Sequence, residues 1–237
     1  MTEALQTEAE VVDLAVTPLR DLNQRLHDIA LAGESPRRWR IVNPRGAHAV
    51  ACGLDAEIDV EIDGHVGYYC AGMNKLATVR VRGNASTGIA ENMMSGSVVV
   101  EGSVSQSAGA TAHGGMLVVH GDAAARCGIS MKGVDIVVRG SVGHLSAFMA
   151  QTGCLVVCGD AGDALGDSIY EARLYVRGEV AGFGADCVEK EVRAEHVDQV
   201  RDLLERAGID DVDPASFRRY GSARQLYNFR IDNAGAY

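Results

Sequence analysis

The hydrophobic and glycine positions of this chain recur with a period of 19 residues. The repeat is marked by seven glycines with no insertion or deletion between them: Gly64, Gly83, Gly102, Gly121, Gly140, Gly159 and Gly178. A β-branched aliphatic residue stands two positions before each glycine: Ile62, Val81, Val100, Val119, Val138, Val157 and Val176. Another aliphatic residue stands four positions before: Val60, Val79, Val98, Leu117, Ile136, Leu155 and Leu174. This alternation is strand periodicity, whereas a helical repeat would show 3.6-residue spacing and a longer unit.

A constant 19-residue unit predicts one coil of a parallel β-helix, made of three short strands and three turns. A one-residue slip would turn every inward side chain outward, which explains the constant length. The predicted fold class is an all-β solenoid, a right-handed parallel β-helix of about seven 19-residue coils with α-helical N- and C-terminal flanks. The recurring glycine is expected at a corner that requires a positive φ or a close backbone approach. Proline is absent between residues 45 and 213, as expected for strands that hydrogen-bond on both sides.

The flanks are expected to cap the open ends of the sheet, because uncovered edges aggregate. On the N-terminal side, Thr17 and Pro18 resemble an N-cap and a first helical residue, and Gly33 would end the helix. The helix carries one apolar stripe: Leu19, Leu22, Leu26 and Ile29. Residues 36–58 are interpreted as irregular structure or a short strand, in an incomplete first coil.

On the C-terminal side, a second amphipathic helix is predicted over Glu195–Ala207. Asp213 and Pro214 resemble the N-cap and first residue of a third short helix that ends near Tyr220. The tail is expected to be extended, because its apolar residues alternate: Tyr227, Phe229 and Ile231. The chain is therefore divided into an N-terminal helix and arm (1–50), the β-helix (51–190), and C-terminal helices with an extended tail (191–237).

Composition and charge limit the function classes. The 237 residues are 47% hydrophobic and 23% charged, which indicates a globular chain, and the net charge of −10 opposes binding to nucleic-acid phosphates. No apolar run approaches the ~20 residues that cross a bilayer. The N-terminal segment lacks the basic and apolar regions of a secretory signal, so a cytoplasmic location with six reduced cysteines is expected.

Few residues offer a candidate active site. Cys154 and Cys158 lie too far apart along a strand to share one tetrahedral metal. Glu101 and His120 are neighbours in the outward column before the glycines, and two interpretations are open for them: an oriented general base, or part of a solvated ladder of mixed charges. We favour the ladder, because an exposed row lacks a desolvated cleft. No catalytic, cofactor-binding or metal-binding residue is predicted in this chain.

A second outward column is apolar. Three residues before the glycines, the first two copies hold Glu61 and Arg80, and the next five hold apolar residues: Val99, Val118, Val137, Val156 and Tyr175. A stripe of this length on a sheet face marks a contact surface. It is the candidate interface of the molecule, and either a partner subunit or the chain's own terminal segments could cover it.

Several coils carry a family resemblance. GNASTGIAENMMSG at 83–96, GDAAARCGISMKG at 121–133 and GDAGDALGDSIYEARLYVRGE at 159–179 resemble the GXGXG-repeat domain of the glutamate synthase large subunit. The resemblance is closest to the free-standing version of this domain, the β-helix subunit of N-methylglutamate synthase (methylamine–glutamate N-methyltransferase), and it includes the flanks TPLRDLNQRL and FRRYGSARQLYNF. Ile89-Ala90 and Ser146-Ala147 stand where sister coils place glycine.

The resemblance implies a right-handed β-helix without catalytic residues, in a hetero-oligomer. The implied partners are a glutamine-amidotransferase-like subunit and a synthase subunit that holds FMN and an iron–sulfur cluster. No functional residue carries over, because the family's catalysis lies in those other chains. The β-helix subunit of formylmethanofuran dehydrogenase is similar in its repeat, so a scaffold of that complex, or of a formyltransferase–hydrolase, is an alternative. A self-contained β-helix acyltransferase or lyase is disfavoured, because the period of 19 breaks a six-residue subperiod and the slip-free coils leave no long insertions.

Overall fold

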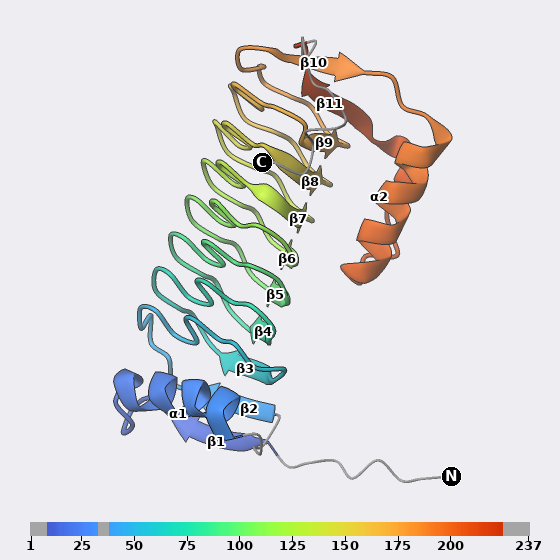
Figure 1. Cartoon of the computed structure of the whole chain (residues 1–237). Coiled ribbons are helices and arrows are strands. Elements are labelled where there is room, and N and C mark those ends of the chain that lie inside the picture. The colour runs from blue at the N-terminus through green and yellow to red at the C-terminus, as the bar shows by residue number, and fades with distance from the viewer. Residues whose placement is uncertain (1–8, 33–37, 225–237) are drawn as a thin grey trace, which may run out of the picture.

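The computed structural model describes residues 9–32 and 38–224, and its strands form one sheet that runs the length of a solenoid (Figure 1). The strand order is β1-β2-β3-β4-β5-β6-β7-β8-β9-β11-β10. The strands are β1 (Glu10–Asp13), β2 (Arg38–Val42), β3 (Asp59–Asp63), β4 (Thr78–Val81), β5 (Ser97–Val100), β6 (Met116–Val119), β7 (Lys132–Val138), β8 (Thr152–Val157), β9 (Arg173–Val176), β10 (Cys187–Lys190) and β11 (Arg218–Ser222). The helices are α1 (Leu19–Ala32), α2 (Ala194–Arg206) and the 3₁₀ helix η1 (Pro214–Ser216).

The coils stack in register at the predicted period. Strands β3 to β9 pair in parallel, and Val79 lies beside Val98, which lies beside Leu117, in steps of 19 residues. Both predicted inward columns are buried, with side chains at most 1% exposed. The sequence prediction of an all-β parallel solenoid of about seven turns is therefore confirmed.

The internal structure of each coil differs from the prediction of three strands. Each coil has one strand, followed by a single-residue bridge two positions after the corner glycine, such as Ala85 to Val104. The rest of the coil is a turn segment in which Ala71, Ala90 and Ala147 adopt left-handed backbone with φ of 51–57°. These alanines are fully buried. Only small residues suit this column, because it combines a left-handed φ with a position inside the stack.

The corner glycines are required by close approach of neighbouring coils. Gly64 has a positive φ of 137°, but the other six do not. A Cβ on Gly121 would lie 2.8 Å from the carbonyl carbon and oxygen of Gly102, and the corner glycines from Gly83 to Gly178 repeat this close contact. The N–H of Gly121 also donates to the Gly102 carbonyl at 3.0 Å. Of the two reasons expected for glycine, the close approach applies to most of the column.

The N-terminal end of the stack is capped by α1 and two added strands. β2 is an extra coil, 21 residues before β3 in register, and β1 pairs with it in parallel. The predicted helix is confirmed as α1, whose Leu22 and Leu26 are buried. The Asn23 amide donates to the Ala49 carbonyl at 2.9 Å and accepts from the Ala51 N–H at 3.0 Å. It thereby supplies the hydrogen-bond partners that a further coil would provide to these backbone groups.

The C-terminal end corrects one prediction. The helix expected near residues 195–207 is present as α2, but the third helix is limited to η1, and the segment expected to complete it is strand β11. β11 pairs antiparallel with both β9 and β10, so backbone hydrogen bonds of the last coil outweigh the local helix signal of Asp213 and Pro214. Gly33 and the apolar residues of the tail lie outside the described residues.

Candidate functional site

The outer face of the sheet is divided into two halves of different chemistry. Its central column holds Arg40, Glu61 and Arg80 on β2 to β4 and becomes apolar at Val99 on β5. In Figure 1, α2 lies along the later strands of the stack, and none of the described helices covers the outer face of β3 and β4. The outer face therefore offers two separate candidate contact surfaces.

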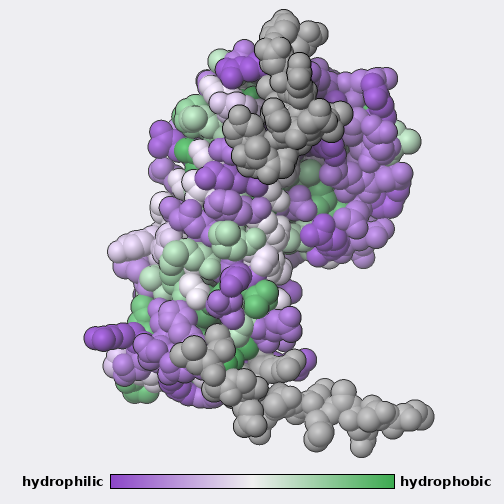
Figure 2. Space-filling view, viewed as in Figure 1, coloured by the Kyte–Doolittle hydropathy of each residue, from purple (hydrophilic) through white to green (hydrophobic). Residues whose placement is uncertain are grey.

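The apolar half is covered by the chain's own helix. The five residues of the candidate interface are at most 9% exposed: Val99, Val118, Val137, Val156 and Tyr175. They form one cluster with Val200, Leu203 and Leu204 of α2 and with the loop residues after it. Figure 2 shows hydrophobic atoms in the seam between this helix and the stack. Of the two coverings that the sequence left open, the terminal segment is the one in the structure, because the apolar face of α2 needs burial as much as the stripe does.

Polar contacts hold α2 and the loop after it in place. The Tyr175 hydroxyl donates to Gln199 Oε1 at 2.8 Å, and Arg139 forms an ion pair with Asp211 at 2.6 Å. The imidazole of His196 accepts the Arg193 N–H through Nδ1 at 3.0 Å. Burial, and then the charge of Arg219, lower the pKa of His196, so this imidazole is neutral near pH 7.

The charged half is an ion-pair network across coils. The guanidinium of Arg82 donates from Nε and Nη2 to the two carboxylate oxygens of Glu61, at 3.0 and 3.1 Å. Arg40 Nη2 forms an ion pair with Asp63 Oδ2 at 2.6 Å. The hydrogen bond from Arg82 lowers the pKa of Glu61. An open trough of about 660 Å³ runs over this face, and its lining includes Arg38, Asp59 and Arg80. Its charges are mutually satisfied, so the trough has no group poised for acid–base chemistry.

The structure does not support Glu101–His120 as an oriented base. His120 Nε2 lies 3.9 Å from Glu101 Oε2, beyond hydrogen-bond distance. Instead, the carboxylate of Glu101 accepts from Arg80 Nη1 at 2.5 Å and lies 3.7 Å from Arg82. The arrangement is the charged ladder that the sequence analysis favoured.

Five of the six cysteines are core residues, and Cys52 is half-buried. Burial raises the pKa of Cys70, Cys127 and Cys154 to about 12 and that of Cys158 and Cys187 to about 11. Thiols with such values are protonated at neutral pH, so they are poor nucleophiles and metal ligands. No group of three or more His, Cys, Asp or Glu side chains that could hold a metal occurs among the described residues.

A hydrogen-bonded side-chain ladder runs beside the corner glycines, and sequence reasoning missed it. The residue after each of the first six glycines accepts the N–H of its counterpart one coil later, as Asn84 does from Ser103 at 2.9 Å and Asp122 does from Ser141 at 2.8 Å. The column is His65, Asn84, Ser103, Asp122, Ser141, Asp160 and Glu179. The signal was available, because every member carries a side-chain hydrogen-bond acceptor.

Exposed apolar side chains gather on the first complete coils. Met73, Leu76 and Met94 are 44–48% exposed. Their segments are adjacent rungs, because the Met94 N–H donates to the Asn74 carbonyl at 2.8 Å. Figure 2 shows hydrophobic residues concentrated on this part of the stack, between purple regions at both ends. We call these three residues the methionine patch; such patches mark protein contacts.

Together, these features define the class of protein: a capped parallel β-solenoid whose polar groups are mainly used to hold coils and caps together. The family model for the GXGXG motif matches residues 46–209, and the chain belongs to that family. The chain is also 62% identical to Protein GlxC of Rhizobium meliloti (strain 1021) over 227 residues, which cover 96% of this chain and 99% of that protein. None of the helices in the described part of the chain is long and apolar enough to cross a membrane.

Proposed function

We propose that this chain is a non-catalytic scaffold subunit of a glutamate-synthase-like complex. It holds a glutamine-amidotransferase-like subunit against a synthase subunit that carries FMN and an iron–sulfur cluster. The proposed reaction of the whole complex is that of N-methylglutamate synthase, in which methylamine and glutamate form N-methylglutamate and ammonia. Membership of the GXGXG family and 62% identity to Protein GlxC over nearly the full chain support a common role for the two proteins.

The observation that carries the proposal is the uninterrupted ladder along the stack. Backbone bonds, the glycine contacts and the side-chain ladder join each coil to the next. At ~4.8 Å per coil, seven coils keep two ends of a rod roughly 30 Å apart. A body of this kind holds two partners at a fixed separation, which is the property a scaffold between two active sites requires.

The chemistry of the side chains supports the same role. The charged outer face is internally ion-paired, and the buried thiols are protonated. The methionine patch offers a surface that can adapt to a partner. We therefore place one of the two subunit contacts at Met73, Leu76 and Met94.

A second candidate is a scaffold in a formylmethanofuran dehydrogenase or formyltransferase–hydrolase complex, or in a glutamate synthase. The solenoid would serve those complexes equally well, because its features concern rigidity and not the substrate. The resemblance of both flanks to the β-helix subunit of N-methylglutamate synthase favours the first proposal.

The test is purification of the tagged chain at its natural expression level. We expect a flavin-containing subunit and an amidotransferase-like subunit to copurify, and the complex to convert ¹³C-methylamine and glutamate into labelled N-methylglutamate. A complex that acts on formyl compounds would support the second candidate. A lone chain that is active by itself would contradict both proposals.

Matched variants test the contact and the absence of cofactor. Met73→Asp with Met94→Asp should break the complex while the isolated chain keeps its melting temperature, since both side chains are about half exposed. Met149→Asp is the control, because Met149 is a methionine of similar exposure, 42%, and lies four coils further along the stack than Met73. The isolated chain should show no absorbance above 320 nm, so a flavin or iron–sulfur band from the pure chain would contradict the scaffold assignment.

A further inference from the structure

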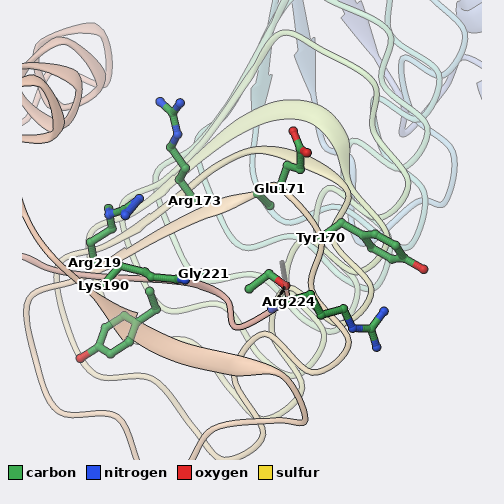
Figure 3. A pocket seen from close by; sticks show the side chains of 10 residues that line it. Tyr170, Glu171, Arg173, Lys190, Arg219, Gly221 and Arg224 are labelled. Carbon is green, nitrogen blue, oxygen red and sulfur yellow. Dashed lines mark hydrogen bonds between the residues drawn. The ribbon is translucent and has the colours of Figure 1, made fainter. Parts of the chain in front are cut away.

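A basic hollow lies at the C-terminal end of the stack, away from the methionine patch. It has a volume of about 300 Å³, and its lining includes Arg173 on β9, Lys190 on β10, Arg219 on β11 and Arg224 after β11. In Figure 3, Arg173 and Arg219 lie on one side of the hollow, and Tyr170 and Arg224 lie on the opposite side. Four cationic side chains around one hollow are unusual in a chain whose net charge is −10.

Most of this positive charge is not neutralised by the described residues. Arg224 is held by Asp186. Arg173 instead donates to the neutral amide of Gln199 at 2.9 Å, and Arg219 donates to the Glu191 carbonyl at 3.1 Å. Among the described residues that line the hollow, Glu171 is the only carboxylate. The hollow therefore keeps a positive potential that attracts anions.

The strand pairing places two of these charges against each other. In the antiparallel register of β10 and β11, Lys190 lies directly opposite Arg219. Like charges directly opposite on one sheet face destabilise the pair. An anion bound between them would remove that cost, so the register itself points to a ligand that carries negative charge.

Gly221 forms part of the lining and leaves room above the sheet. A Cβ at this position would meet only Lys190 carbons and the Ala172 carbonyl oxygen, at 3.8–3.9 Å, and its φ is not in the left-handed region. The Lys190 side chain therefore lies beside open space. A carboxylate entering this space comes within reach of Lys190.

We propose that this basic hollow binds an acidic segment of a partner protein. The hollow is open, so a single small anion stays largely solvated there and gains little from one ion pair. A segment with several carboxylates engages Arg173, Lys190 and Arg219 together, and the second and third contacts form at high effective concentration. The inference rests on the proposed function only in that a scaffold has partners, and it identifies a second contact surface.

The test uses the full-length chain and a fluorescein-labelled peptide of ten glutamates, followed by anisotropy. We expect binding that weakens as NaCl is raised, since the contacts are exposed ion pairs. Lys190→Glu should weaken binding at least tenfold. Arg20→Glu makes the same change in net charge at an exposed site on α1, at the other end of the stack, and should leave binding within twofold of the wild type. Equal losses in the two variants would show an effect of net charge alone and overturn the proposal.

A second pair of variants distinguishes a direct loss of binding from a loss caused by misfolding. Gly221→Asp puts a carboxylate into the hollow and should abolish binding, whereas Gly221→Asn has nearly the same shape and should retain it. Lys190→Glu replaces a like-charge pair with an opposite-charge pair, so it should melt at or above the wild-type temperature. Wild-type affinity in both Lys190→Glu and Gly221→Asp would overturn the proposal.

A competition experiment tests whether small anions bind in the hollow. Displacement of the labelled peptide by 1 mM inorganic phosphate or L-glutamate would identify the hollow as a small-anion site and overturn the proposed occupant. Continued binding of the peptide in the presence of these anions supports the proposed acidic segment. These outcomes are independent of the proposed function, because a failed peptide assay leaves the copurification result unchanged.

Discussion

The strongest prediction concerns the glycine ladder, at Gly121→Ala. The new Cβ would lie 2.8 Å from the Gly102 carbonyl carbon and oxygen and 2.5 Å from Ser103 Oγ, whereas ordinary contacts begin near 3.4 Å. Two backbones must therefore separate by several tenths of an ångström at the centre of the stack. Overpacking of this kind costs ~1–3 kcal/mol. Distortion of the bond from the Gly121 N–H to the Gly102 carbonyl adds ~0.5–1.5 kcal/mol.

The expected total for Gly121→Ala is a loss of about 2–4 kcal/mol in the free energy of unfolding. For a chain of this size, that lowers the melting temperature by roughly 5–15 °C. Urea unfolding followed by circular dichroism measures it. The control is Gly221→Ala, whose Cβ has only ordinary contacts at 3.8–3.9 Å, and which should match the wild type or stabilise it by up to ~1 kcal/mol. If Gly121→Ala proves as stable as Gly221→Ala, the close-approach explanation is wrong.

Three further predictions concern the caps. Asn23→Ala leaves the Ala49 carbonyl and Ala51 N–H without their amide partner and should cost ~1–3 kcal/mol, measured by urea unfolding; an unchanged midpoint would show that water replaces the amide. Val137→Asp puts a carboxylate into the fully buried contact with α2, so it should undock the helix and increase hydrogen exchange there, and unchanged protection would contradict the packing. Because the pKa of His196 is lowered in the folded chain, the unfolded chain takes up the proton first, and stability should fall as the pH drops below ~6.5. His196→Gln should reduce that fall between pH 7.5 and 5.5, and an identical pH dependence in both proteins would rule out this imidazole as the cause.

The parts of the fold that sequence reasoning predicted depend on repetition. The columns of Val98 and Val100 predicted burial because seven aligned copies made the strand alternation unmistakable. The helix α2 was predicted without repetition, because its apolar spacing and the glycine after it are strong local signals. The partition of each coil into one strand and left-handed turns was missed, because alanines such as Ala90 carry no local signal for a positive φ.

The candidate contact surfaces could be predicted only in part, because the segments that cover or form them are distant in sequence. The stripe from Val99 to Tyr175 was correctly placed on the outer face, but an apolar column does not specify what covers it. The same holds for β11, where the helix signal of Asp213 and Pro214 lost to pairing with β9 and β10. The basic hollow was not predicted, because Arg173 and Arg219 are far apart in sequence and meet only through that pairing.

The sequence by itself determined the period, the register and the inward faces of this solenoid, because stacked copies must agree in length and in side-chain direction. Tertiary structure alone decided how the ends are closed and which surfaces stay exposed. Those outcomes depend on the competition among distant segments for one sheet face and two open edges. Burial of the stripe by α2 and the meeting of Lys190 with Arg219 are the results of that competition.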